Sequence, residues 1–189
     1  QVHGRVITAA DARARSRLSD SDGVYVRHSA FPLRTRQPDV NVVIRAYLAG
    51  LSACRNGAPV LGSGIFVSGA GDKGGRLVVK RLETDAIYSD GKIAPGTPDQ
   101  ISGGVFTVYG AHVDLVRNRG PVVTYGVNDM VLDNWGAVDR WTAEEKITSY
   151  GPSGIGFVNF GTGNGLEDTA PLETFGKRAS SSNVSPGTV

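Results

Sequence analysis

The sequence is poor in cysteine and histidine. Cys54 is the only cysteine among 189 residues. A lone cysteine cannot close an internal disulfide, and it cannot form a paired CxxC metal clip. The three histidines, His3, His28 and His112, are isolated from one another and show no HxH or HExxH spacing. No zinc site is therefore expected.

Long apolar runs are also missing. The most apolar stretch, residues 42–67, is interrupted by Arg45, Arg55, Asn56 and several glycines, so no membrane-spanning helix is expected. The chain begins at Gln1 instead of methionine and shows no signal peptide, so we expect a processed form or a fragment. The composition favours a soluble protein without membrane contact, and an extracytoplasmic location is slightly favoured.

Neither positive nor negative charge is in large excess. The formal net charge is +2, and no block of lysine or arginine stands out, so nucleic acid is not expected as a partner. The GxSxG, P-loop and helix-opening GxGxxG motifs are absent, so no such motif identifies a reaction. With 40% hydrophobic residues, the chain can bury one core of ordinary size.

Glycine, by contrast, is abundant, and six glycines directly follow an aromatic residue. These pairs are Tyr109-Gly110, Tyr125-Gly126, Trp135-Gly136, Tyr150-Gly151, Phe160-Gly161 and Phe175-Gly176. The aromatic positions form two interleaved series, each repeating every 25 or 26 residues. A fixed period of this length is typical of a repeat architecture.

Each 25-residue unit contains three short runs typical of β-strands. In the unit 146–170 these are residues 147–150, 155–160 and 166–168, separated by glycine-rich turns. We therefore predict an all-β fold, a right-handed parallel β-helix with about 25 residues and three strands per coil. A β-sandwich is the alternative, since short strands with frequent turns also describe it.

The predicted domain is a single solenoid over 1–189. Its coils occupy 23–189, with an inserted loop at 91–104, and residues 1–22 form the N-terminal cap region. Thr8-Ala9-Ala10-Asp11 reads as a capping box that opens a short helix ending near Leu18. The sequence stops in the middle of a unit at Val189. Either the solenoid is a fragment of a longer one, or its uncapped C-terminal end self-associates with another chain.

Stacked coils place equivalent residues in columns. Two aromatic columns are expected, one of Tyr125, Tyr150 and Phe175, and one of Tyr109, Trp135 and Phe160. Further columns are expected at Thr124, Ser149 and Thr174, at Val122, Ile147 and Leu172, and at Asn134 and Asn159. The aromatic columns are interpreted as corner or core packing in preference to platforms for sugars.

These aromatic, asparagine and hydroxyl columns resemble those of the right-handed parallel β-helix superfamily, the pectin-lyase-like fold. The resemblance covers about residues 65–189, and no catalytic motif of a particular family is matched. It implies a capping helix at the N-terminus and a carbohydrate-binding or polysaccharide-cleaving protein of the lyase or glycoside hydrolase type. The partner would be a polysaccharide or oligosaccharide. A non-enzymatic structural or interaction solenoid is the alternative, and whether the chain is an enzyme is left open.

Two aspartates lie near one another around the expected middle strand of the unit 121–145, and an arginine lies one expected strand later. Asp129, Asp133 and Arg140 are the candidate catalytic residues, because a carboxylate pair can act as acid and base. The alternative, which the sequence favours, is a solvated turn at Asn128-Asp129 followed by an exposed strand residue at Asp133. Trp135 and Asp90 are the candidate substrate-binding residues, and Asp90 directly precedes the loop 91–104.

Calcium is a candidate cofactor. Asp114, Asp139 and Asn164 are spaced 25 residues apart and are expected to stack. Two stacked aspartates repel one another without a cation, so this column could mark a cation site.

Overall fold

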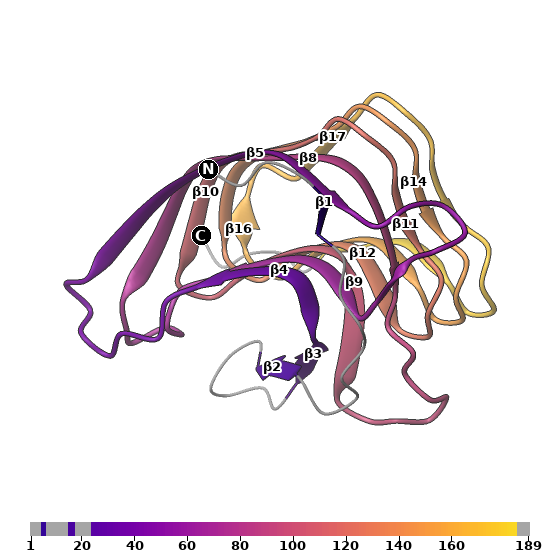
Figure 1. Cartoon of the computed structure of the whole chain (residues 1–189), viewed down its shortest axis with the longest axis horizontal. Coiled ribbons are helices and arrows are strands. Elements are labelled where there is room, and N and C mark those ends of the chain that lie inside the picture. The colour runs from indigo at the N-terminus through magenta and orange to yellow at the C-terminus, as the bar shows by residue number, and fades with distance from the viewer. Residues whose placement is uncertain (1–4, 7–14, 18–23, 185–189) are drawn as a thin grey trace.

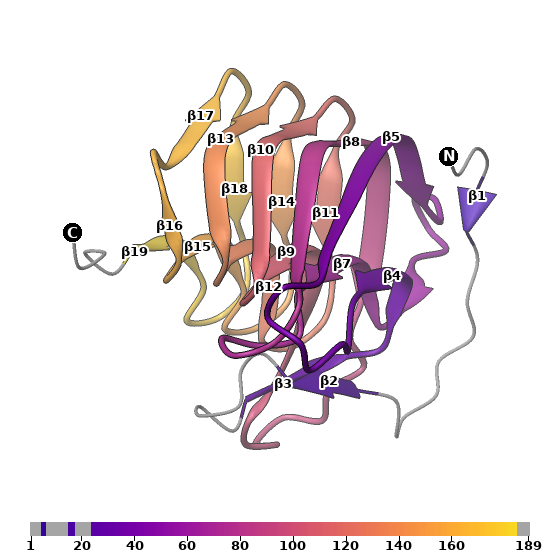
Figure 2. The ribbon, with the colours of Figure 1, turned by 90° about the vertical axis from the view of Figure 1, so that its left-hand side faces the viewer.

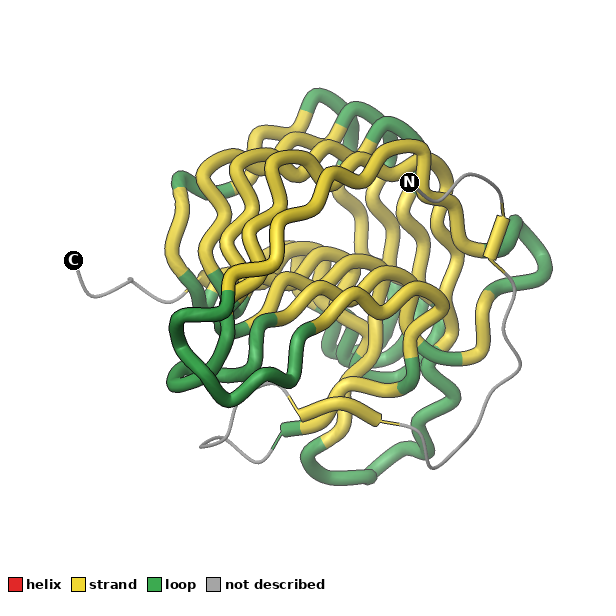
Figure 3. The backbone as a smooth tube through the Cα atoms, turned by 60° about the vertical axis from the view of Figure 1, so that its left-hand side comes forward, coloured by secondary structure: helices red, strands yellow, loops and turns green. Residues whose placement is uncertain are grey.

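The computed structural model describes residues 5–6, 15–17 and 24–184, with side chains described for 24–182. These residues form two β-sheets connected by loops, with no helix (Figure 3). The 11-stranded sheet comprises β1 (Arg5–Val6), β5 (Val43–Ala53), β6 (Val60–Leu61), β8 (Arg76–Asp90), β10 (Ala111–Asn118), β11 (Val122–Thr124), β13 (Ala137–Ala143), β14 (Ile147–Ser149), β16 (Thr162–Gly163), β17 (Leu166–Asp168) and β18 (Leu172–Thr174). The 8-stranded sheet comprises β2 (Arg15–Arg17), β3 (Tyr25–Arg27), β4 (Ser29–Arg34), β7 (Ser63–Ser68), β9 (Gln100–Val108), β12 (Asp129–Asn134), β15 (Ile155–Asn159) and β19 (Ser180–Val184). The described part of the chain therefore contains no helix long and apolar enough to cross a membrane.

The strands pair in parallel. Val122 of β11 lies beside Ile147 of β14, which lies beside Leu172 of β18. The strands β12, β15 and β19 pair in the same 25-residue steps. Among the described strands, only β2 and β3 pair antiparallel. The all-β prediction is confirmed, and the pairing differs from the antiparallel sheets of a β-sandwich.

The 11-stranded sheet bends into two sides because β8 is long enough to serve both. The first part of β8 pairs with β10, and its last residues pair with β11. The 8-stranded sheet lies across from these two sides (Figure 1), and in the view of Figure 2 the strands β5, β8, β10 and β13 lie side by side. Successive segments of the chain thus lie on one side after another, and the core lies between these sides.

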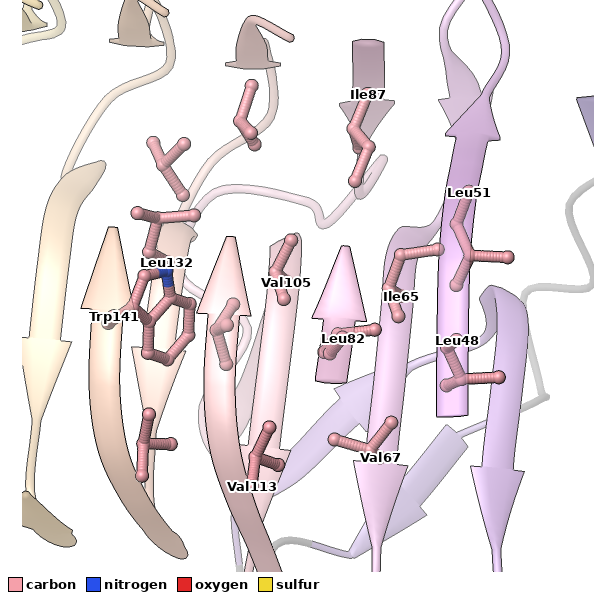
Figure 4. Close-up of a cluster of buried hydrophobic side chains, with 14 of the residues drawn as sticks. Leu48, Leu51, Ile65, Val67, Leu82, Ile87, Val105, Val113, Leu132 and Trp141 are labelled. Carbon is pink, nitrogen blue, oxygen red and sulfur yellow. The ribbon is translucent and has the colours of Figure 1, made fainter. Parts of the chain in front are cut away.

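The core between the sheets is apolar. Leu82 of β8, Val105 of β9 and Leu132 of β12 point into it together with Trp141 of β13 (Figure 4). Trp141 is 1% exposed, and its indole Nε1 donates a hydrogen bond of 2.8 Å to Asn118 Oδ1. Burial of each such aliphatic side chain stabilises the fold by about 1.5–3 kcal/mol.

The predicted columns are confirmed. The rings of Tyr125 and Tyr150 stack at 5.5 Å, and those of Tyr150 and Phe175 at 5.3 Å. Thr124 Oγ1 donates to Ser149 Oγ at 3.2 Å. Like residue therefore lies beside like residue in successive 25-residue units, as the sequence spacing predicted.

Two predictions about the N-terminal half need correction. Arg15–Arg17, placed in the capping helix by the sequence, form strand β2 instead, and its backbone pairs with β3. A helix there has little apolar face to bury, whereas the strand satisfies its hydrogen bonds on a neighbour. The rest of the predicted capping helix, residues 8–14 and Leu18, lies outside the described residues.

The inserted loop is shorter than predicted. It ends at Asp99, because residues 100–108 form β9. Gly103 and Gly104, read as loop residues in the sequence, lie in the middle of a sheet. A Cβ atom on Gly104 would lie 2.6 Å from the carbonyl oxygen of Val131 on the adjacent strand. These glycines permit a close approach between strands and do not mark a turn.

Candidate functional site

A groove of about 430 Å³ lies at the corner where the chain leaves the 8-stranded sheet for the 11-stranded one. Its wall is the aromatic column of Tyr109, Trp135 and Phe160, which directly follow β9, β12 and β15. The ring centroids of Tyr109 and Trp135 lie 6.2 Å apart, and those of Trp135 and Phe160 lie 4.7 Å apart. Phe160 is 37% exposed, so this column forms part of the surface.

The glycine after each aromatic residue allows the corners to stack. A Cβ atom on Gly136 would lie 2.8 Å from the carbonyl oxygens of both Val108 and Ala111. One on Gly161 would collide with the backbone of Gly136 in the preceding unit. Only glycine fits this approach, and the resulting close stacking brings the three aromatic side chains into one column beside a floor of small residues.

Asn134 fixes the turn that carries Trp135. Its Oδ1 accepts hydrogen bonds from Thr107 Oγ1 at 2.7 Å and from the backbone N–H of Gly136 at 3.1 Å. Its Nδ2 donates to Asn159 Oδ1 at 2.9 Å and to the carbonyl oxygen of Thr162 at 3.2 Å. The side chain is almost completely buried. Asn134 therefore ties together three successive units at the base of the groove.

The rim opposite the aromatic wall is polar. Arg76 and His112 line it from β8 and β10. Arg76 is exposed and forms no ion pair with another described residue. His112 Nε2 lies 2.8 Å from Asp139 Oδ1. The groove thus combines an apolar wall of tilted aromatic rings with hydrogen-bonding groups, the usual composition of a small-ligand site.

The three predicted catalytic residues do not converge. Asp129 and Asp133 both lie on β12 and are completely buried. Arg140 lies on β13 in the other sheet, where its exposed guanidinium binds Glu167 Oε2 at 2.8 Å. The structure therefore does not assemble Asp129, Asp133 and Arg140 into an acid–base pair with an adjoining cation, and their catalytic role stays a prediction.

Burial raises the pKa of both aspartates. Burial raises the pKa of Asp129 to about 7, although hydrogen bonds from Ser102 Oγ and the Gly126 backbone N–H oppose the shift. Burial raises the pKa of Asp133 to about 8. The nearby indole of Trp135 acts in the opposite direction, but it is not in hydrogen-bonding geometry, and both carboxyl oxygens of Asp133 lack a partner. Asp129 anchors a turn, whereas Asp133 is a buried acid with the Trp135 indole as a polar neighbour.

The two predicted substrate-binding residues lie apart. Trp135 forms the middle of the groove wall. Asp90 lies at the end of β8, where it forms an ion pair of 2.7 Å with Lys92 Nζ and contributes to the environment of buried Asp129. Asp90 does not line the groove.

Arg76, His112 and the small residues at the floor of the groove were not among the predicted site residues. Arg76 precedes the clear 25-residue register, and no local signal marks it. A signal did exist for His112. It lies two residues before Asp114, and this period-2 spacing places both side chains on the outer face of a strand.

Comparison with known proteins adds no identification. No protein-family model matches the chain, and no curated protein or solved structure is significantly similar to it.

Proposed function

We propose that this protein binds a glycan in the groove lined by Tyr109, Trp135 and Phe160, on the scaffold of a right-handed parallel β-helix. The observation that carries the proposal is the partly exposed aromatic column beside a polar rim. The proposed ligand is a segment of polysaccharide or an oligosaccharide.

The scaffold proposal is supported by the pairing of the strands. Parallel strands separated by 25 residues lie side by side on each of the three sides of the molecule, as in β12 with β15, β11 with β14 and β10 with β13. Connections between parallel strands of one sheet are right-handed in about 98% of cases. The right-handed form of the solenoid is therefore the one to propose.

The chemistry of the groove suits a sugar. A pyranose ring has apolar faces that pack on aromatic side chains, and a hydroxyl rim that needs hydrogen-bonding partners. Trp135 and Phe160 offer the apolar contact, whereas Arg76, His112 and Thr162 add polar side chains to the lining. Adjacent β-strands are about 4.8 Å apart, so the platforms recur along the stack and suit an extended ligand better than a compact one.

We propose binding and not cleavage as the role of the groove. Asp129 and Asp133 are buried away from solvent, and Arg140 is engaged with Glu167 on another side of the molecule. A glycosidase of the usual kind needs two carboxyl groups flanking the bond that breaks. The residues that line the groove include no carboxylate.

The test is glycan binding by the wild-type protein and two alanine variants. After a glycan-array screen, calorimetry with the best ligand should show that Trp135→Ala weakens binding about 10-fold or more, a loss of about 1.4 kcal/mol. Phe175→Ala is the matched control, because it removes an exposed aromatic ring of the other column. It should bind as the wild type does. If the folded wild-type protein binds no glycan, or if Trp135→Ala binds normally, the proposal fails.

An interaction module is the second candidate, and one observation favours it. Tyr125, Tyr150 and Phe175 form a second aromatic strip, which precedes the N-terminal ends of β12, β15 and β19. Phe175 is 61% exposed. Such a strip can pack against a partner protein. In the glycan experiment a pure interaction module would give no binding to any sugar.

A further inference from the structure

We propose a divalent transition-metal site formed by His112, Asp114 and Asp139, at the rim of the groove. The three side chains project from the outer face of the 11-stranded sheet, two from β10 and one from β13. This site goes beyond glycan binding, because it requires only the metal ion.

The sheet register brings the ligands together. Val113 lies beside Val138 and Leu115 beside Arg140 in the β10–β13 ladder, so Asp114 lies directly beside Asp139. His112 and Asp114 point outward on either side of buried Val113. One ligand atom from each of the three residues lies within 4.8 Å of the others. The positions are therefore set by backbone pairing and not by flexible loops.

The two aspartates repel one another, and a bound cation would relieve that repulsion. Two carboxylates on directly opposed residues of adjacent strands destabilise a sheet. Asp139 is partly relieved by His112 at 2.8 Å. Asp114 forms no ion pair with any described residue, but Lys80 of β8 lies beside it in the β8–β10 register, and Lys80 and Arg45 border the same shallow hollow. A divalent ion between the three groups would turn the repulsion into attraction.

The donor set selects the kind of metal. Calcium and magnesium prefer oxygen ligands alone, whereas an imidazole nitrogen with carboxylates suits zinc, manganese, nickel and similar ions. Neighbouring ligands of an octahedral ion at about 2.1 Å are separated by about 3 Å. His112 Nε2 and Asp139 Oδ1 already lie 2.8 Å apart, and small rotations of exposed Asp114 bring in the third ligand.

Three protein ligands leave open coordination positions. The groove opens on the His112 side of the cluster, and the shallow hollow opens on the Asp114 side. A metal held there can contact the hydroxyl or carboxylate oxygens of a ligand in the groove. This last step rests on the proposed function, whereas metal binding itself does not.

The test is calorimetric titration of the tag-free protein with ZnCl₂, MnCl₂ and CaCl₂ in the absence of sugar. We expect saturable one-to-one binding of zinc or manganese and none of calcium. Asp139→Asn and His112→Gln should each weaken binding about 10-fold or more. Asp168→Asn is the matched control, because it removes an exposed carboxylate from β17 on the same sheet, and it should bind normally.

Two results would overturn the metal site. One is the absence of saturable zinc or manganese binding by folded wild-type protein. The other is binding that Asp139→Asn and His112→Gln leave unchanged, which would place the ion elsewhere. Neither depends on sugar, so a failed glycan screen leaves this test intact, and a failed metal titration leaves the aromatic groove intact.

Discussion

Replacing Asp133 by valine is expected to raise the free energy of unfolding at pH 8 by about 3 kcal/mol. The carboxyl group is completely buried and neither oxygen has a hydrogen-bonding partner. Its neighbours in the sheet are Phe106 on β9 and Val158 on β15, so valine continues an apolar row. A buried polar or charged group without a hydrogen-bonding partner costs at least about 1–3 kcal/mol, and more when it is charged. Urea unfolding of both proteins measures the difference.

The same residue makes the stability of the wild-type protein depend on pH. The pKa of Asp133 is raised to about 8 in the folded protein, against about 3.9 in an unfolded chain. The folded state therefore holds this proton where the unfolded state has lost it. The contribution is fully present below about pH 4 and is lost as the pH rises to about 8. For a shift of this size the loss amounts to as much as about 5 kcal/mol.

Asp133→Asn separates the charge from the shape of the side chain. The variant should lose the Asp133 part of the pH dependence between pH 5 and pH 8.5. It should keep the smaller part from Asp129, whose pKa is raised to about 7. If the free energies of unfolding of the wild type and of Asp133→Asn fall in parallel over this range, Asp133 ionises normally and is not buried as described.

Replacing Asn134 by alanine is expected to lower the free energy of unfolding by about 3–4 kcal/mol. The substitution removes all four hydrogen bonds of the buried amide and leaves the N–H of Gly136 and the side chain of Asn159 without those partners. Leaving a buried polar group unpaired costs about 1–3 kcal/mol for each group. Chemical denaturation of the variant measures the loss.

Asn164→Ala is the matched control for Asn134→Ala. Asn164 is exposed and donates one hydrogen bond, of 3.0 Å, to the carbonyl oxygen of Asp139. Its removal should cost less than about 1 kcal/mol. Equal losses for the two variants would mean that the asparagine column does not hold the corner together. Asn134→Ala should also weaken glycan binding, because the turn that carries Trp135 loses its support.

The sequence predicted the columns because their cause is local and periodic. A unit of 25 residues places Tyr125 beside Tyr150 and Asn134 beside Asn159 whenever parallel strands pair in that register. The sequence period does not indicate whether the side chains of a column at a corner point into the core or toward solvent. The sequence favoured corner or core packing, and the rings do pack on one another at the corners, although Tyr150 and Phe160 are also exposed at the surface.

Other features depend on pairings that cannot be read locally. The sequence suggests that Asp133 is an exposed strand residue. In the structure it lies in a row with Phe66 and Phe106. These two residues form a second apolar cluster with Val26 of β3. The link of β3 to β9 joins distant parts of the chain. In the ladder between β5 and β8, three register shifts obscure the period. Arg76, at the start of β8, thus carried no signal of its place in the groove.

The most direct test of glycan binding in the groove is the fluorescence of Trp135. The protein has two tryptophans, and Trp141 is buried in the core, so Trp141→Phe leaves Trp135 as the only tryptophan, whose emission is followed with selective excitation. Saturating this variant with a glycan that binds should shift and quench its emission, with a midpoint equal to the calorimetric Kd. Unchanged emission while calorimetry records binding would place the sugar away from Tyr109, Trp135 and Phe160 and would contradict the proposed site.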